Sequence, residues 1–314
     1  MTAISPRTLA YLSLGAICII WGTTYTGIKL AIRDFPPFLL VGLRQILGGL
    51  VLLALAWAMG RFQVPGWAYT GRQMFMGLLT ITGGNGLITW GMQYVSSGLS
   101  SVIGSLTPVV VVLINILWRG GEPVSLRVVA GVLIGFLGLG VVFHDGWQDF
   151  LDPRYRWGIV AAFGSCFTWS LGTVMAKRYN APGVSPVLNA GLQVLFGGLF
   201  ALPLHFLLDP VQPVRHTTEG WVAVLYLAFI GSAVAFSLYM FALQHLSAAV
   251  SSLYTYINPV VAITMGWLFL DERLSPTAIA GMAVTIFGVW LVNSGIRVEW
   301  RKRMIYGVFK KKAP

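Results

Sequence analysis

The chain has 314 residues, of which 56% are hydrophobic and 10% are charged, and its mean hydropathy is +0.77. Soluble domains carry about 25% charged residues, so this composition excludes an ordinary water-soluble fold and indicates a membrane protein. The net charge of +11 does not indicate a nucleic-acid partner, because seven of the basic residues lie in the short stretch 297–314, where they can contact anionic lipid headgroups.

Ten apolar runs follow one another along the chain. Each is near the roughly 20 residues that a helix needs to cross the hydrocarbon of a bilayer, so each predicts a transmembrane helix. The runs cover residues 9–32, 38–59, 74–94, 99–118, 126–143, 157–176, 187–208, 221–243, 246–270 and 276–292. The first run is longer than the apolar segment of a signal peptide and no small-residue cleavage pattern follows it, so we expect it to be a helix of the mature protein.

The second half of the chain repeats the first at an offset of about 150 residues. Pro108 aligns with Pro259, and GLRQILGGL at residues 42–50 aligns with GLQVLFGGL at residues 191–199. Self-similarity on this scale indicates a duplicated fold. Because each repeat has an odd number of helices, the predicted fold is all-α and polytopic, with ten transmembrane helices in two inverted five-helix repeats. We expect the repeats at residues 1–145 and 146–296, followed by a basic cytoplasmic tail at 297–314.

The distribution of Lys and Arg predicts the orientation, because cytoplasmic loops carry an excess of basic residues. With the N-terminus in the cytoplasm, fourteen basic residues fall on the cytoplasmic side and five on the other. We therefore expect both termini in the cytoplasm. The single compact module without a targeting segment favours the inner (plasma) membrane of a bacterium.

Three stretches, together with the Pro108 and Glu122 region, resemble the EamA-type drug/metabolite transporter superfamily. The stretches are WGTTYTGIKLAI (residues 21–32), GLRQILGG (residues 42–49) and YTYINPVVAITMGWLFLDERLSPTAIAGMAVTIFGVWLV (residues 254–292). The resemblance implies ten helices in two inverted repeats, a central cavity, and export or exchange of small metabolites. It implies no particular solute, because the superfamily spans amino acids, drugs, nucleotide sugars and other metabolites.

Polar side chains inside the apolar runs are the candidate substrate ligands, because hydrocarbon makes them costly unless they face protein or a wet cavity. Tyr25 and Lys29 share one face of the run 9–32, and Trp169 and Thr173 share the corresponding face of the run 157–176. One interpretation is two cavity-lining stripes related by the repeat. The alternative is that tryptophans and lysines mark helix ends, with the lysines reaching the membrane interfaces.

Arg44 lies within the run 38–59, and its repeat partner is the neutral Gln193. Such a buried cation either binds a substrate carboxylate or phosphate, or it reaches headgroups or caps backbone carbonyls. Further candidate ligands are polar residues of the third, eighth and ninth runs, namely Asn85, Thr89, Gln93, Tyr239, Tyr254 and Asn258.

Prolines interrupt the fourth and ninth runs. Pro108 and Pro259 each free a carbonyl one turn earlier and kink the helix. In transporters such breaks indicate binding sites and hinges. The alternative is close helix packing, which the nearby serines Ser101, Ser105 and Ser251 would also allow.

No catalytic or cofactor-binding pattern is present in the sequence. It contains neither HExxH nor GxxxxGK[ST], and its four histidines have no neighbouring embedded acids or thiols. Cys18 and Cys166 form neither a metal-binding nor a disulfide pattern. We therefore expect no enzyme activity, no metal and no cofactor.

These features predict a carrier that moves small metabolites, such as amino acids or related organic solutes, by export or exchange. Its partners are then a small-molecule solute and membrane lipids, and its glycine-rich faces at Gly131, Gly135 and Gly138 serve packing or a homodimer. The lack of an embedded carboxylate favours a facilitator or exchanger over a proton-coupled carrier. The alternative function is a flippase for lipids or polyprenyl-linked carriers. A laterally open groove would favour the flippase, and a closed, aromatic-lined cavity would favour a soluble metabolite.

Overall fold

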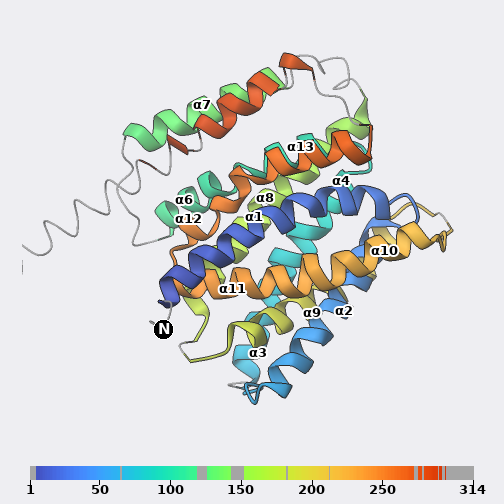
Figure 1. Ribbon diagram of the computed structural model, residues 1–314, viewed down its shortest axis with the longest axis vertical. Coiled ribbons are helices and arrows are strands. Elements are labelled where there is room, and N and C mark those ends of the chain that lie inside the picture. Colours follow the sequence, from blue (N-terminus) through green and yellow to red (C-terminus); the bar gives the residue numbers. More distant parts are fainter. Residues whose placement is uncertain are drawn as a thin grey trace, which may run out of the picture.

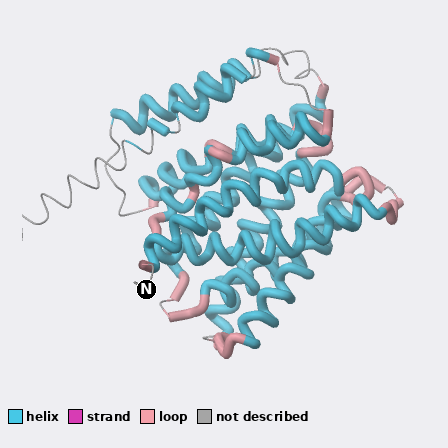
Figure 2. Tube along the Cα trace, in the orientation of Figure 1, coloured by secondary structure: helices cyan, strands magenta, loops and turns pink. Residues whose placement is uncertain are grey.

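The computed structural model describes residues 5–63, 66–118, 126–142, 152–181, 183–211, 213–271, 275–277, 279–288, 290–291 and 294. Within these residues every regular element is helical, and the helices pack into one bundle (Figure 1 and Figure 2). The all-helical prediction is therefore confirmed for the part of the chain that the structure describes. The predicted basic tail at residues 297–314 lies outside the described residues.

The helices of the first half are α1 (Pro6–Ala31), α2 (Pro37–Ala58), α3 (Trp67–Gly77), η1 (Leu78–Gly86), α4 (Leu87–Gly91), α5 (Ser97–Gly104), α6 (Thr107–Leu117) and α7 (Leu126–Val142). Those of the second half are α8 (Pro153–Tyr179), α9 (Pro186–Leu208), α10 (Thr218–Tyr226), η4 (Leu227–Val234), α11 (Ala235–His245), α12 (Ala248–Ser251), η5 (Leu253–Tyr256), α13 (Asn258–Phe269) and a helix at Ile279–Gly288. We call the end of the bundle where α1 begins and α2 ends the near end. The opposite end, where α1 ends and α2 begins, is the far end.

Helix starts follow from local chemistry. A proline occupies the first turn of α1, α2, α8 and α9, a place where the missing N–H costs no hydrogen bond. Ser5, Asp152 and Thr217 each accept a hydrogen bond from a backbone N–H of the helix that follows. Six of the described helical segments are long and apolar enough to cross a membrane.

Irregular helix segments occur at equivalent places in the two halves. The third helix of each half contains a π-helical stretch, η1 in the first and η4 in the second. Pro108 and Pro259 each lie in the first turn of a helix that follows a break, α6 after α5 and α13 after the 3-10 helix η5. The runs 99–118 and 246–270 are therefore broken helices, as the prolines led us to expect. Motion at these breaks stays a prediction.

The two halves meet most closely where α2 crosses α9 (Figure 1). A Cβ atom at Gly49 would lie 2.6 Å from the backbone nitrogen of Leu195, and one at Gly198 would lie 2.9 Å from the backbone nitrogen of Ile46. Side chains do not fit at such distances, so both positions require glycine. Since these residues occupy equivalent positions in the two repeats, the crossing is close to two-fold symmetric.

Helix α7 packs beside the helix Ile279–Gly288 at the edge of the bundle (Figure 1). A Cβ atom at Gly138 would lie 2.4 Å from the backbone nitrogen of Thr285, and one at Gly288 would lie 2.4 Å from that of Gly135. Small residues allow membrane helices to approach this closely. These glycines thus serve packing within the chain, and a homodimer stays a prediction.

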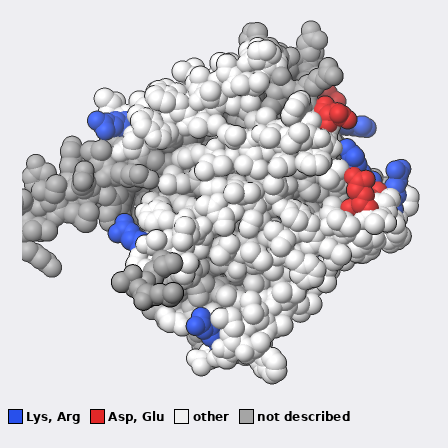
Figure 3. All heavy atoms as spheres, viewed as in Figure 1, with Lys and Arg blue, Asp and Glu red and all other residues white. Residues whose placement is uncertain are grey.

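On the face drawn in Figure 3, the charged side chains of the described residues lie at the two ends of the bundle, and the surface between them is apolar. Large apolar side chains in the middle of helices, such as Ile19 of α1 and Phe167 of α8, are 62% and 53% exposed. Such an apolar band is stable in contact with the hydrocarbon chains of a bilayer. Within the described residues the carboxylates all lie at the far end: Asp34, Asp152, Asp209, Glu219 and Asp271.

Candidate functional site

A cavity of about 90 Å³ lies between the two halves of the bundle. Its walls come from α1, α2, η1, α4, α5 and α6 of the first half and from α8, η4, α11, η5 and α13 of the second. We call it the central cavity. Six of the predicted ligands line it, namely Tyr25, Arg44, Asn85, Trp169, Tyr254 and Asn258.

Five aromatic rings form an aromatic wall at this cavity. The ring centroid of Trp21 lies 5.4 Å from that of Trp169 and 4.6 Å from that of Tyr254. The ring centroid of Trp169 lies 5.7 Å from that of Tyr239 and 6.0 Å from that of Phe236. The rings meet edge to face or tilted, which is the arrangement that their quadrupoles favour. The wall therefore offers the cavity an aromatic surface to which both repeats contribute.

Arg44 supplies positive charge to the central cavity. Its side chain is 2% exposed, and its Nη2 donates a hydrogen bond to Oδ1 of Asn85 at 2.9 Å. Its Nε has no hydrogen-bond partner among the described residues. None of the described residues that line the cavity is Asp or Glu. The cavity thus presents a cation with spare hydrogen-bond donors.

The two π-helical segments connect the halves through backbone carbonyls. The hydroxyl of Ser165 on α8 donates to the carbonyl of Gly84 on η1 at 2.7 Å. The indole Nε1 of Trp21 on α1 donates to the carbonyl of Gly231 on η4 at 2.9 Å. π-helical turns occur frequently at functional sites. Here they lie at the cavity and fix the first helix of each half against the third helix of the other.

Lys29 and Lys177 both donate to carbonyls at the end of a neighbouring helix. The Nζ of Lys29 donates to the carbonyls of Met92 and Val95 just after α4. The Nζ of Lys177 donates to the carbonyl of Leu243 at 2.7 Å, near the end of α11. A cation stabilises a helix C-terminus, so this geometry gives both lysines a structural role. Lys29 does not line the central cavity, and its role as a substrate ligand stays a prediction.

Lys29→Gln is expected to lower the free energy of unfolding by about 1 kcal/mol, because the charge-assisted hydrogen bonds to the helix end are lost. The repeat-related variant Lys177→Gln is expected to lose about as much. Thermal unfolding in detergent measures both changes, and solute affinity is expected to stay at the wild-type value in Lys29→Gln. A fall in affinity of about tenfold at unchanged stability would instead make Lys29 a ligand.

Four further predicted ligands lie outside the lining of the central cavity. Thr173 and Tyr239 are fully buried, and their hydroxyl oxygens lie 2.5 Å apart behind the lining. Thr89 lies on α4, four residues after Asn85, and Gln93 lies in the turn that follows α4. They therefore lie beyond the cavity toward the far end.

Asn258 lines the cavity at the break before Pro259. With its amide oriented so that the nitrogen donates, it bonds to the carbonyls of Tyr254 and Cys18 at 3.1 Å each. The carbonyl of Tyr254 belongs to the 3-10 turn of the broken helix, and Cys18 belongs to α1. Asn258 therefore ties the break to the first helix of the other half.

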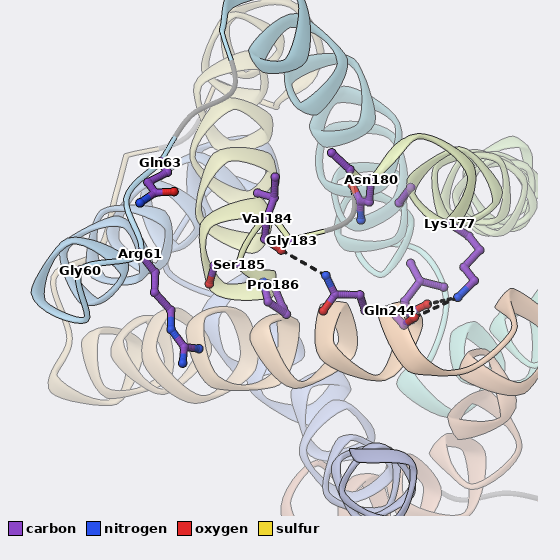
Figure 4. A pocket seen from close by; sticks show the side chains of 13 residues that line it. Gly60, Arg61, Gln63, Lys177, Asn180, Gly183, Val184, Ser185, Pro186 and Gln244 are labelled. Carbon is purple, nitrogen blue, oxygen red and sulfur yellow. Dashed lines mark hydrogen bonds between the residues drawn. The ribbon is translucent and has the colours of Figure 1, made fainter. Parts of the chain in front are cut away.

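A wider pocket of about 910 Å³ opens at the near end, between the ends of α2, α8 and α11 and the start of α9 (Figure 4). Arg61 and Lys177 lie on opposite sides of this near-end pocket. No Asp or Glu belongs to its described lining. The amide of Gln244 donates to the carbonyl of Val184 at 3.1 Å across part of it. The near end is thus hollow and positively charged.

At the far end a carboxylate of the second half caps a helix of the first. The side chain of Asp209 is 1% exposed, and its Oδ2 accepts from the backbone N–H groups of Phe38 at 2.9 Å and Leu39 at 3.2 Å. The same oxygen lies 2.8 Å from Nδ1 of His205. The residue before α2 makes no side-chain cap, so Asp209 satisfies N–H groups that would otherwise be unpaired.

A family model described as the EamA-like transporter family matches residues 8–144 and 156–294. The chain belongs to this family. The EamA chain is 28% identical over 284 residues to a protein named uncharacterized inner membrane transporter YedA from Escherichia coli (strain K12), with 90% of each chain covered. It is 27% identical over 309 residues to the uncharacterized transporter YvbV of Bacillus subtilis (strain 168), with 98% of each chain covered. A solved crystal structure shares the fold, with a TM-score of 0.67 and 21% identity over 91% of this chain and 97% of the other.

The EamA match covers both halves of the chain. The family and these relatives are named as transporters rather than as enzymes. Together with the six long apolar helices, the match makes the EamA chain an integral, multi-pass membrane protein. The relatives' names specify neither a solute nor a direction of transport.

Several residues that line the cavity of the EamA chain did not stand out in the sequence: Thr24, Gln45, Ser165, Ser232 and Phe236. Small polar residues are too common in membrane helices to indicate a site by themselves. Phe236 follows η4, and a π-helical turn shifts the face of the helix after it. A regular period of 3.6 residues therefore does not show that Phe236 reaches the cavity.

Proposed function

We propose that this EamA chain carries small organic solutes across a bacterial inner membrane by alternating access at the central cavity. In this proposal ten helices cross the membrane as two inverted five-helix repeats, and both termini lie in the cytoplasm. The near end is then the cytoplasmic end. The main support is that both halves line one cavity with polar and aromatic side chains, since carriers built from inverted repeats bind their substrates between the repeats.

The two hollow regions fit one state of such a carrier. The near-end pocket of about 910 Å³ is wide, and the far end is tied by Asp209 to the start of α2. The central cavity, at about 90 Å³, is smaller than the roughly 300–1,000 Å³ typical of ligand sites. A solute would therefore have to separate the walls, and the breaks at Pro108 and Pro259 are the hinges that we propose for this movement.

The solutes that we propose are amino acids or related organic solutes, moved by export or exchange. The aromatic wall suits the apolar part of such a solute, and Arg44 and Asn85 suit its polar part. An aromatic lining also favours a soluble solute over the lipid of a flippase. Because the carboxylates among the described residues all lie at the far end, a facilitator or exchanger fits better than a proton-coupled carrier.

Solute counterflow into proteoliposomes tests this function. The full chain is reconstituted and offered labelled amino acids, organic phosphates and hydrophobic cations. Gly104→Leu is expected to reduce the flux of any transported solute by about tenfold or more, because the added side chain enters the cavity. A Cβ atom at Gly104 would have one described neighbour within 4 Å, the Tyr25 hydroxyl at 2.9 Å, so the fold has room for the change.

Gly15→Leu is the matched control, because a Cβ atom at Gly15 on α1 meets no described atom within 4 Å. This variant is expected to transport as the wild type does. The proposal is contradicted when wild type moves none of the panel, or when Gly104→Leu moves its solute as fast as Gly15→Leu.

A further inference from the structure

The guanidinium of Arg44 is a buried charge for which the chain provides few partners. It makes one hydrogen bond to Asn85, and its Nε is unpaired among the described residues. A guanidinium has five N–H donors, and removing a cation from water without partners is costly. The described lining of the central cavity contains no Asp or Glu, and the ion pair of Asp209 with His205 lies at the far end. Nothing in the described lining therefore balances the charge of Arg44.

The fold itself does not require a charge at this position. The repeat-related residue of α9, Gln193, is neutral and fully buried, and its Nε2 donates to Oε1 of Gln73 at 2.7 Å. The two helices cross with near two-fold symmetry, so a neutral side chain of similar length is compatible with the backbone geometry of α2. A buried charge that the fold does not need is expected where a residue serves function rather than stability.

The entrance at the near end has the same sign of charge. Arg61 and Lys177 lie on opposite sides of the near-end pocket, whose described lining has no carboxylate (Figure 4). Like charges around a concave surface raise the local concentration of solutes of opposite charge. The pocket and the central cavity are therefore both expected to attract anions and to repel cations.

From these observations we infer that the transported solutes carry a carboxylate, and that Arg44 binds this carboxylate in the central cavity. The inference rests on the proposed function and names the substrate class. A planar guanidinium matches a planar carboxylate with two parallel hydrogen bonds. One negative charge also balances the single charge of Arg44, whereas a phosphate dianion would leave an excess negative charge in the cavity. Asn85 positions the guanidinium through the bond to Nη2.

Pairs of probes that differ only in charge test the inference. The purified full chain in detergent is titrated with 3-phenylpropionate and 3-phenylpropionamide, with L-lactate and L-lactamide, and with phenylphosphonate. In wild type at least one carboxylate is expected to bind about 10- to 100-fold more tightly than its amide, the range expected for a charge-assisted hydrogen-bond pair. Arg44→Gln is expected to remove this preference. Arg33→Gln, at an exposed position just after α1 that lines neither pocket, is expected to keep it.

Asn85→Asp provides a second variant that does not depend on the folding of Arg44→Gln. Its carboxylate would take the place of the amide 2.9 Å from Nη2 and neutralise Arg44 internally, so the preference for carboxylates is expected to disappear while the protein stays folded. The inference is overturned if every amide binds as tightly as its acid in wild type, if phenylphosphonate binds more tightly than the carboxylates, or if Asn85→Asp keeps the preference.

Binding and counterflow together separate this inference from the proposed function. A chain that moves neutral or cationic solutes but shows no carboxylate preference retains the proposed function and loses the inference. A chain that binds carboxylates through Arg44 but moves no solute retains the carboxylate site and loses the proposed function.

Discussion

Gly49→Val is expected to lower the free energy of unfolding by about 3 kcal/mol or more, at the upper end of the cost of overpacking a core. The reason is the crossing of α2 and α9, where a Cβ atom at Gly49 would lie 2.6 Å from a backbone nitrogen of Leu195. Backbone atoms cannot move aside as a flexible side chain can, so the helices would have to separate. The midpoint of thermal unfolding in detergent measures the loss.

Two companion variants make this result specific. Gly198→Val is expected to cost about as much, because the near two-fold symmetry places its Cβ atom 2.9 Å from the backbone nitrogen of Ile46. Gly15→Val makes the same change where no described atom lies within 4 Å, and it is expected to unfold at the wild-type temperature. Equal midpoints for Gly49→Val and Gly15→Val would show that α2 and α9 are not in close contact.

Asp209→Ala is expected to lower the free energy of unfolding by about 2 to 3 kcal/mol, because buried N–H donors lose a charged acceptor. The donors are the backbone groups of Phe38 and Leu39, at 2.9 and 3.2 Å from Oδ2, and α2 has no side-chain cap from the residue before it. The carboxylate is also favoured at this place by the dipole of α2. The change is measured as for Gly49→Val.

Asp152→Ala is the matched control for Asp209→Ala. Asp152 also accepts from a backbone N–H at a helix start, that of Arg154 at 2.8 Å, but it is exposed and caps the helix that directly follows it. Its loss is expected to cost about 1 kcal/mol or less. If both alanine variants lose the same amount, the burial of Asp209 and its link between the halves contribute nothing.

The helical fold and its duplication could be predicted because both leave a regular pattern along the sequence. Apolar runs of membrane-spanning length and a constant offset need no knowledge of contacts. The breaks at Pro108 and Pro259 could also be predicted, since proline lacks the N–H that a helix interior uses. The π-helical turns could not be predicted from the sequence. They depend on which carbonyl finds a donor across the bundle, as Gly84 does with Ser165.

The sequence indicated the polar residues of the central cavity that are most unfavourable in hydrocarbon. It did not indicate which other side chains meet them there. Arg44 and Asn85 stood out because polar groups in hydrocarbon require a partner. Lys29 stood out for the same reason and on the same helix face as Tyr25, yet it lies one turn further along and reaches the carbonyl of Met92. Depth along a helix and the position of partner carbonyls are three-dimensional facts. The residue spacing that defines a helix face shows neither of them.

The cap on α2 is not repeated at the other end of the molecule. The residue equivalent to Asp209 is Gly60, next to Arg61, and the start of α9 receives no side-chain cap from Ser185. The far end thus has a charged cap between the halves that has no counterpart among the described residues of the near end, and we expect the empty carrier to rest with the near end open. Such a bias cannot change the equilibrium distribution of a solute across the membrane. It makes the apparent affinity higher on the side to which the resting carrier opens, because there no binding energy is spent on changing the conformation first.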